Sequence, residues 1–235
     1  MIQVRPSAER GYADHGWLRA RHSFSFADYY DPAEMGWGVL RVINEDRVAP
    51  GKGFGTHGHR DMEIVTYILS GALEHKDSLG HGGVIRRGEV QRMSAGTGIR
   101  HSEFNPLPDQ ETHLLQIWIE PSQHGTPASY EQQALPIEEL RGRWRLVASP
   151  DGAEGSTTIG QDARLWASVL VPGEAAEYRL TAGRLAYVQV VSGQLSVNGQ
   201  RLVAGDGAKI ADETQLEFLA GEEAEILLFD LPPVA

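Results

Sequence analysis

The amino-acid sequence predicts an all-β protein with few helices, in which two similar barrels follow one another along the chain. The 235 residues include 27 glycines and 12 prolines. Short runs of valine, isoleucine and leucine are separated by these turn-forming residues, a pattern typical of β-sandwiches and β-barrels. A segment of the first half also recurs in the second half, which indicates that one unit of structure is repeated.

Seven short apolar segments bounded by turn residues are expected to form strands. They are residues 38–46, 63–71, 89–96, 112–121, 164–171, 185–193 and 224–232. Residues 196–202 are expected to form a tight hairpin, because Asn198 and Gly199 readily adopt the positive φ angles of a two-residue turn. Residues 130–142 are the one segment with clear helical character, and they lie where a link between two halves would fall.

The internal repeat defines the expected domains. The segment "ILSGAL" at residues 68–73 matches "VVSGQL" at residues 190–195. We therefore expect an N-terminal barrel over residues 1–135 and a C-terminal barrel over residues 136–235. Because two such barrels can cover each other's apolar faces, we expect a monomer. The alternative is that the match reflects only the general composition of β-hairpins.

Charge and composition exclude several classes of function. Lysine and arginine total 21 against 32 aspartates and glutamates, so the net charge of −11 repels phosphate backbones and we expect no direct nucleic-acid binding. The chain has no cysteine, so any metal must be held by histidine and carboxylate. No apolar run approaches the roughly 18 residues that a membrane-spanning helix needs, and the first residues lack the apolar core of a signal peptide. We therefore expect a cytoplasmic protein without membrane contact.

Two pairs of metal-ligating residue types occur at i, i+2 spacing. Alternate side chains of a strand share one face, so His57 and His59 would point to the same side of an extended segment. His101 and Glu103 form a second pair. Two adjacent strands that point these pairs inward would bring three imidazoles and one carboxylate around one point. Such a donor set suits a borderline divalent ion such as Fe(II), Mn, Ni, Cu or Zn.

Other polar residues near these pairs are candidates for supporting the ligands. If the chain stayed extended after the two histidines, Asp61 and Glu63 would follow on the same face. A neutral imidazole binds a metal through one nitrogen, and its other nitrogen needs a partner. Asn105, Gln116 and Glu63 are the candidates for that role.

Imidazole chemistry is expected in the first barrel alone. All nine histidines lie between residues 15 and 124. The offset of 122 residues that aligns the repeat, reduced by five after a shorter hairpin in the second half, places other residue types at the four ligand positions of the second barrel. In the order of His57, His59, His101 and Glu103, these are Arg179, Thr181, Phe218 and Ala220. We therefore expect the C-terminal barrel to be a degenerate copy without metal ligands.

The spacing around the histidines is close to that of the cupin superfamily. Gly51, the HxH segment of residues 57–59, Glu63 and Gly71 resemble its first motif, and the segment from Gly88 to "HSEFN" resembles its second. One departure is a serine, Ser94, where the second motif usually has proline.

At finer detail nearly the whole chain resembles the pirin family, whose members are bicupins with a metal in the first barrel. The most specific segments are "HGWLRARHSFSFADYYDPAEMGWGVLRVINED", "GFGTHGHRDMEIVTYILSG", "MSAGTGIRHSEFNP" and "LLQIWIEP". The resemblance implies that the ligands are His57, His59, His101 and Glu103, with Glu63 outside the coordination sphere. It also implies one divalent transition metal, with Fe(II) preferred and Ni, Mn, Cu, Co and Zn left open.

The resemblance also indicates a function. Bacterial pirins are associated with quercetin 2,3-dioxygenase activity, and the animal member with an iron-dependent nuclear regulator. We expect a dioxygenase that cleaves a flavonol such as quercetin with O₂, in which Glu103 takes the proton of a small aromatic or enediol substrate. One alternative is a metal-binding, redox-sensitive regulatory module that docks on a protein partner. Another is an isomerase or oxygenase of the cupin type that acts on a different substrate.

The remaining residues of note receive structural interpretations. The aromatic segment from Phe24 to Tyr30 is expected to pack in the core or over the barrel, with the lining of a flavonol pocket as the alternative. Arg60, Arg86, Arg87 and Arg92 are expected to form a solvated face. The histidines without a partner at useful spacing are expected to be surface or core residues. These are His15, His22, His75, His81, His113 and His124.

Overall fold

The computed structural model describes residues 1–233 and consists of strands joined by turns and three short 3₁₀ helices. The elements of the first half are β1 (Ile2–Arg5), η1 (Ser7–Glu9), β2 (Gly11–Asp14), β3 (Leu18–His22), β4 (Leu40–Val48), β5 (Gly53–His59), β6 (Glu63–Ser70), β7 (Ala72–Asp77), β8 (Gly82–Arg86), β9 (Glu89–Ser94), β10 (Ile99–Phe104), β11 (Thr112–Ile119) and β12 (Ser129–Ala134). Those of the second half are η2 (Ile137–Glu139), β13 (Arg145–Ser149), η3 (Ala153–Gly155), β14 (Thr157–Thr158), β15 (Arg164–Leu170), β16 (Ala175–Arg179), β17 (Leu185–Ser192), β18 (Gln194–Val197), β19 (Gln200–Val203), β20 (Gly207–Ile210), β21 (Gln215–Ala220) and β22 (Ala224–Leu231).

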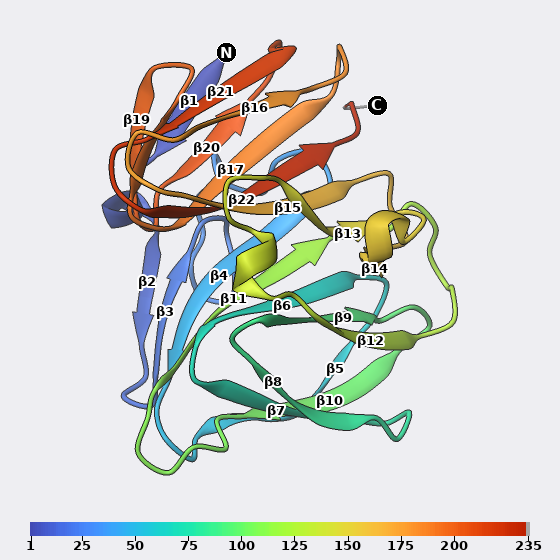
Figure 1. The fold of residues 1–235 in the computed structure, drawn as a ribbon. Helices are drawn as coiled ribbons and strands as arrows, with labels where there is room; N and C mark the ends of the chain where they lie inside the picture. Colours follow the sequence, from blue (N-terminus) through green and yellow to red (C-terminus); the bar gives the residue numbers. More distant parts are fainter. Residues whose placement is uncertain (234–235) are drawn as a thin grey trace.

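The two halves repeat one topology. In the first, a seven-stranded sheet in the order β12-β9-β6-β11-β4-β3-β2 accompanies a four-stranded sheet in the order β5-β10-β7-β8. In the second, the matching orders are β1-β20-β17-β22-β15-β13-β14 and β16-β21-β18-β19. Figure 1 shows these as two stacked units, blue to green below and orange to red above. The prediction of two tandem β-barrels of the cupin type is confirmed.

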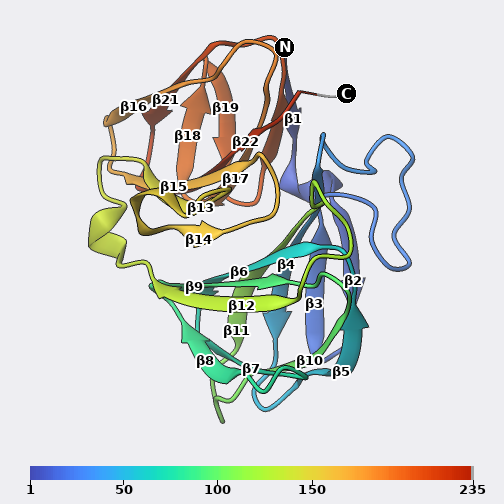
Figure 2. The ribbon, with the colours of Figure 1, turned by 90° about the vertical axis from the view of Figure 1, so that its right-hand side faces the viewer.

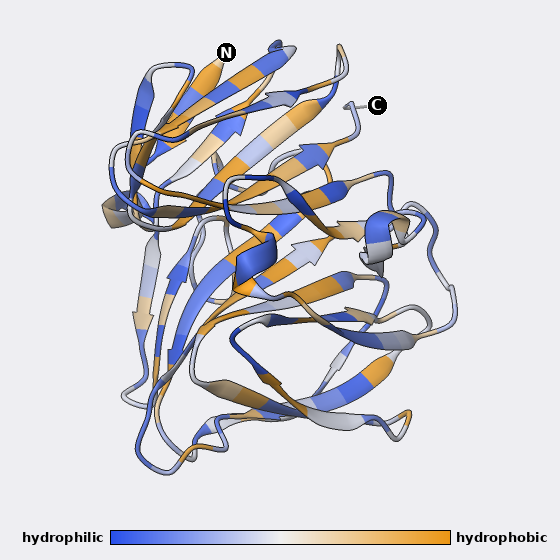
Figure 3. Cartoon of the chain, in the orientation of Figure 1, coloured by the Kyte–Doolittle hydropathy of each residue, from blue (hydrophilic) through white to orange (hydrophobic). Residues whose placement is uncertain are grey.

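The seven predicted strands and the predicted hairpin are present. The strands correspond to β4, β6, β9, β11, β15, β17 and β22, with ends that differ by a few residues. In the hairpin between β18 and β19, Asn198 and Gly199 have φ angles of 45° and 79°, as the turn type requires. Hydrophobic and hydrophilic residues alternate along several strands in Figure 3, as expected for sheets with one face in a core.

The predicted helix over residues 130–142 is wrong. Residues 129–134 form strand β12, which pairs with β9 over its whole length, and only Ile137–Glu139 form a single 3₁₀ turn. A helix of this length is marginal in water by itself, whereas pairing with the open edge of β9 supplies a full ladder of hydrogen bonds. Pro136 then prevents the chain from continuing in either form.

The first strand of the chain belongs to the sheet of the second half. β1 pairs with β20, in the position that β12 occupies next to β9 in the first half. The blue strand beside the orange strands in Figure 2 shows this exchange. The domain division at residues 135 and 136 stays a prediction, and the pairing of β1 ties the two halves together across it.

The two seven-stranded sheets pack face to face and enclose one shared core. It includes Ile43, Val65 and Ile117 from the first half with Leu227 and Phe229 from the second. Phe24, from the predicted aromatic segment, is buried here against the Tyr187 ring at 5.5 Å. The interior of the second half is filled by one continuous apolar cluster, whereas that of the first is divided into two smaller ones. The first half therefore has interior space for a site.

A buried polar cluster also crosses this interface. Glu225 on β22 accepts hydrogen bonds from the Tyr67 hydroxyl of β6 and from the guanidinium of Arg87, which donates from Nη1 at 2.8 Å. Arg92 is buried, and its Nη2 lies 2.8 Å from Glu131. The prediction of a solvated arginine face is therefore wrong for Arg92, whereas Arg87 is 30% exposed and also binds Glu225. It is confirmed for Arg60 and Arg86.

None of the helices within residues 1–233 has the length and apolar character needed to cross a membrane.

Candidate metal centre

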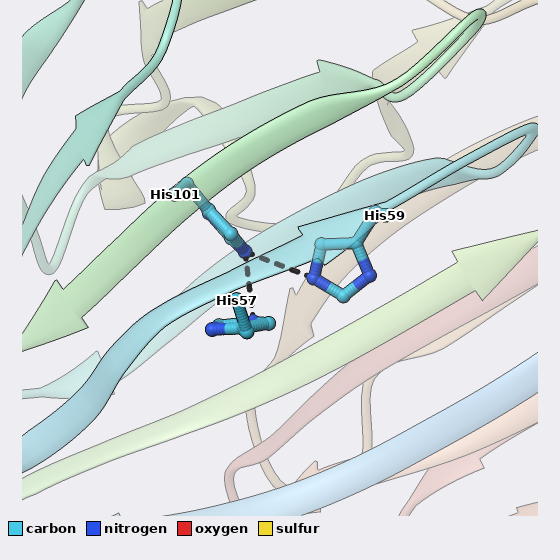
Figure 4. A group of neighbouring side chains, drawn as sticks. All are labelled: His57, His59 and His101. Atoms are coloured by element: carbon cyan, nitrogen blue, oxygen red, sulfur yellow. Dashed lines mark hydrogen bonds between the residues drawn. The ribbon is translucent and has the colours of Figure 1, made fainter.

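Three histidines of the first barrel converge on one point, and we call them the histidine cluster: His57, His59 and His101. Strands β5 and β10 are antiparallel neighbours, with His57 opposite His101. The Nε2 atom of His101 lies 2.9 Å from Nε2 of His59 and 3.1 Å from Nε2 of His57 (Figure 4). Gly53 permits this close approach of the strands, because a Cβ atom there would lie 2.1 Å from the Glu103 carbonyl oxygen.

The geometry of the histidine cluster fits a metal ion. Two ligands at right angles on an ion with bonds of about 2.1 Å lie about 3.0 Å apart, which is the spacing of these nitrogens. Burial, followed by the neighbouring His57, lowers the pKa of His59 to about 4. Burial and the other histidines lower the pKa of His101 to about 3. Neutral imidazoles are the form that binds a metal.

Partners on the far side of the rings fix two of these imidazoles. The Nδ1–H of His57 donates to the Gly55 carbonyl oxygen at 2.8 Å, which leaves Nε2 as the free lone pair. The Nδ1 atom of His101 lies 3.3 Å from Nδ1 of the fully buried His75. His75 in turn donates from Nε2 to Asp77 at 3.1 Å. The chain from Asp77 through His75 therefore orients His101 with Nε2 toward the cluster.

Glu103 lies beside the histidine cluster, and its side chain is buried. A carboxylate oxygen of Glu103 is within 4.8 Å of ring nitrogens of His101 and His75. Burial raises the pKa of Glu103 from 4.5 to about 7, although Gln116 donates to both carboxylate oxygens at 3.2 and 3.3 Å. Thr66 holds Gln116 through a hydrogen bond of 2.7 Å. Glu103 is thus a positioned carboxyl that changes protonation near neutral pH.

The other residues considered from the sequence lie elsewhere. Strand β5 ends at His59, and Asp61 adopts a positive φ of 47°, so the expected extension of the histidine face to Asp61 and Glu63 is wrong. Glu63 instead accepts from Ser94 at 2.7 Å and lies against Gly160 of the second half. Ser94, which stands where the second cupin motif usually has proline, therefore has Glu63 as its hydrogen-bond partner. Of the three supporting candidates, Gln116 contacts Glu103.

Asn105, the remaining candidate, is not a partner of the cluster. Its side-chain nitrogen donates to the carbonyl oxygens of Val48 and Gln110, at 3.0 and 2.8 Å. It therefore holds the loop after β10 in place.

In the second barrel, the strand pairing shows which residues occupy the ligand positions. Arg179 and Thr181, as aligned from the repeat, are displaced by one residue, because β5 has an extra residue opposite His101–Glu103 that β16 lacks. Phe218 and Ala220 are displaced by two residues, because the chain from Gly88 to His101 is two residues longer than the chain from Gly205 to Leu216. The residues at the matching positions, in the order of His57, His59, His101 and Glu103, are Tyr178, Leu180, Leu216 and Phe218. All four pack in the apolar interior. Within residues 1–233, the groups able to hold a metal lie in the first barrel alone.

A cavity of about 260 Å³ leads to the histidine cluster. Its walls are mainly apolar and include Leu18, Phe26, Phe54, Leu73, Leu114 and Trp118. The Trp118 ring lies 5.0 Å from that of His59 and 5.4 Å from that of Phe26. Part of the predicted aromatic segment therefore lines the pocket, as the alternative interpretation had it. A second cavity of about 540 Å³ shares several lining residues with the first.

Sequence reasoning missed several polar residues of this pocket and its support. His22, Asn44 and Asp46 line the cavity, while His75 and Asp77 lie behind His101. Burial, followed by the neighbouring Glu103, raises the pKa of Asp46 to about 7. The available signal was the alternation in "RVINED", which places Asn44 and Asp46 on one face of a strand that is otherwise apolar on that side.

The metal-free protein is expected to lose stability relative to a Glu103→Gln variant as the pH rises from about 4.5 to about 7. Because the folded chain binds the Glu103 proton more tightly than the unfolded chain, this contribution is complete below pH 4.5 and is lost as the pH rises through the folded pKa of about 7. The difference between the two pKa values corresponds to roughly 3 kcal/mol. Denaturant unfolding of both metal-free proteins at about pH 5 and about pH 8 measures it.

The lowered pKa values of His59 and His101 act in the opposite direction, but they are present in both proteins and cancel in the comparison. A stability difference that does not change with pH would show that Glu103 titrates normally.

The fold and the site together define a bicupin whose first barrel alone carries a histidine and carboxylate cluster. Residues 3–119 match the family model named Pirin, and residues 146–231 match that of the quercetinase C-terminal cupin domain. Over the whole of both chains, the sequence is 47% identical to the quercetin 2,3-dioxygenase of Escherichia coli strain K12. It is 46% identical to a pirin-like protein of Caulobacter vibrioides, over 98% of this chain and 99% of the other. The chain belongs to the pirin family.

A solved structure shares the complete fold. The crystal structure of the bacterial pirin YhhW of Escherichia coli in complex with nickel(II) superimposes with a TM-score of 0.96, at 47% identity and over 100% of both chains. That protein therefore holds a divalent ion within the same two-barrel architecture.

Proposed function

We propose that this protein is a metal-dependent dioxygenase that cleaves a flavonol such as quercetin with O₂. The observation that carries the proposal is the convergence of three imidazole nitrogens, at 2.9 and 3.1 Å, at the end of an apolar pocket and beside a buried carboxyl group. The names of the relatives from Escherichia coli strain K12 and Pseudomonas aeruginosa support the reaction type.

The metal is held, in this proposal, by the histidine cluster and Glu103. Fe(II) is our first choice, and the same donor set accepts Ni, Mn, Cu, Co or Zn. The nickel(II) complex of the related pirin supports a divalent ion without distinguishing among them. When bound, such an ion supplies Lewis acidity, which lowers the pKa of a substrate hydroxyl.

Glu103 is proposed to take the proton of that hydroxyl. A general base is most effective when its pKa lies near the working pH. In the metal-free protein, burial raises the pKa of Glu103 to about 7. Gln116 holds the carboxylate in position, and the apolar walls around Phe54 and Trp118 exclude water. The flavonol then loses its central ring as one O₂ is incorporated and one carbon monoxide leaves.

The proposal includes a monomer in the cytoplasm that binds a small aromatic substrate and no nucleic acid. The net charge of −11 supports the expectation that the protein binds no nucleic acid. The core shared by the two large sheets supports a monomer.

Oxygen uptake tests the proposed function. Protein reconstituted with Fe(II) without air is mixed with quercetin and O₂, and is compared with the chelated protein and with a His101→Ala variant. The expected result is one O₂ consumed per quercetin by the loaded wild-type protein and none by the other two. Uptake that persists after chelation, or that is undiminished in the variant, would exclude this site as the place of reaction.

Loss of the partner behind His101 is expected to weaken metal binding. A His75→Phe variant keeps a ring stacked near Tyr130 but removes the acceptor for the Nδ1–H of His101. The loss of such a partner lowers metal affinity about 10- to 100-fold. Competition with a chromogenic chelator measures the affinity. His81→Phe is the matched control, because His81 contacts the same Asp77 from the exposed side; equal affinities in the two variants would refute the orienting role.

A further inference from the structure

One wall of the pocket is polar, and neither the histidine cluster nor Glu103 accounts for it. From Val42 onward, the even-numbered residues of β4 lie on the side of the strand that faces the first barrel, which brings Asn44 and Asp46 to the cavity. Asn44 is paired with His22 of β3 on one side and with Gln116 of β11 on the other. His22, Asn44 and Asp46 are only 6%, 3% and 6% exposed, and we call them the polar wall.

The hydrogen-bonding capacity of the polar wall is only partly used. Nδ1–H of His22 donates to the side-chain oxygen of Asn44 at 2.7 Å, which leaves the His22 Nε2 atom as an acceptor. Within residues 1–233, neither that atom, nor the Asn44 side-chain nitrogen, nor the Asp46 carboxylate has another hydrogen-bond partner. None of these atoms is sealed inside the protein, so they face the cavity. Buried polar groups left without partners are costly, so such a set is expected to have a ligand to bind.

The position of the polar wall indicates what that ligand looks like. His22 and Gln116 are two strands apart, which is about 10 Å, and Gln116 holds Glu103. Asn44 lies between them, and apolar and aromatic side chains, including Phe26 and Leu114, line the same cavity. A rigid, flat molecule with oxygen atoms at both ends fits this arrangement, because its middle contacts apolar walls and its two ends meet polar groups.

We propose that the His22 end of the polar wall recognises hydroxyl groups on the aromatic ring remote from the reacting carbon, and so selects flavonols with a hydroxylated pendant ring. His22 accepts a hydrogen bond from a ring hydroxyl and Asn44 donates to one, whereas Asp46 lies on the side of the wall next to Glu103. The orientation of the substrate rests on the proposed function, in which the other end of the flavonol lies at Glu103. The three residues position the substrate and take no part in the proton transfer.

Anaerobic binding of two flavonols to the Fe(II)-loaded protein tests this selection. Quercetin carries two hydroxyls on its pendant ring, whereas galangin carries none. With neutral hydrogen bonds as the source of the difference, wild-type protein is expected to bind quercetin about tenfold more tightly in a calorimetric titration. In a His22→Phe variant, which keeps the aromatic ring beside Phe26, the preference is expected to disappear while galangin affinity stays within about twofold.

A second variant and a control keep the test decisive. Asn44→Asp preserves shape and keeps an acceptor for the His22 Nδ1–H but replaces the donor group by an oxygen, so it should also reduce the preference; His124→Phe, at an exposed position, should not. Equal affinity of wild-type protein for both flavonols, or equal weakening of both in the two variants, would overturn the proposal. Because binding is measured without O₂, a retained preference with no oxygen uptake would refute only the proposed reaction. Oxygen uptake without a preference would refute only the polar wall.

Discussion

A Glu103→Gln variant loaded with metal is expected to turn over quercetin about 100 to 10 000 times more slowly than the wild-type protein, since a positioned general base contributes a factor of this size. The amide has the shape of the carboxylate and still offers an oxygen atom, but it cannot take a proton. Gln116 lies 3.2 and 3.3 Å from the two carboxylate oxygens, so the side chain stays tethered in the variant. The rate constant is measured in single turnovers at saturating Fe(II), with the bound metal quantified in the same samples.

Glu63→Gln is the matched control for this substitution. Glu63 is also a buried glutamate of the first half whose pKa is raised by burial, but its carboxylate is bonded to Ser94 and lies against Gly160. The turnover rate of the Glu63→Gln protein is expected to stay within about threefold of the wild-type rate, because Glu63 makes no contact with the reacting groups. A Glu103→Gln protein that carries one metal and retains at least a tenth of the wild-type rate would rule out Glu103 as the base.

The placement of ligand-type side chains on common faces was predictable from local spacing, because side-chain alternation in strands depends on few residues. His57 and His59 at i, i+2, and likewise His101 and Glu103, had to present their side chains on one face of their strand. What the spacing did not contain was the register that sets His57 opposite His101. That pairing depends on contacts between strands distant in sequence, and the family resemblance supplied it instead. The ligand roles of these residues remain a prediction.

The polar residues behind and beside the cluster were missed for a different reason. His75 has no partner at strand spacing other than Asp77, and its contact with His101 arises only when β7 pairs with β10. His22 similarly meets Asn44 through the pairing of β3 with β4. A single histidine in a strand is usually a surface or core residue, so composition and spacing give such positions no distinguishing signal.

The errors in secondary structure and in register both arise from the way strands pair, which the local sequence does not specify. Residues 129–134 have polar side chains that suit a helix, yet the open edge of β9 draws them into a sheet. Likewise, an extra residue in β5 opposite His101–Glu103 moves the positions equivalent to His57 and His59 in the second barrel by one residue. Local propensity is a weak signal where tertiary hydrogen bonding is available.

A Glu225→Ala variant is expected to lower the free energy of unfolding by about 2 to 4 kcal/mol, because it leaves two partners without their acceptor. The Glu225 side chain is 7% exposed and joins β22 of the second half to Tyr67 and Arg87 of the first. The Tyr67 hydroxyl is buried and would lose its partner, whereas Arg87 is 30% exposed and can turn partly to water. This exposure places the expected loss below that of a fully buried ion pair.

Glu223→Ala is the matched control, two residues earlier on the same side of the second barrel. Its carboxylate lies 3.4 Å from Arg141 in a pair whose side chains are 61% and 52% exposed. Such surface pairs contribute about 0 to 1 kcal/mol. Urea unfolding of the two variants and the wild-type protein in the same buffer measures both effects. Because Glu225 contacts both halves, its loss is expected to weaken the packing between them as well as the second barrel. Equal destabilisation by Glu225→Ala and Glu223→Ala would show that the cluster of Glu225, Tyr67 and Arg87 does not hold the halves together.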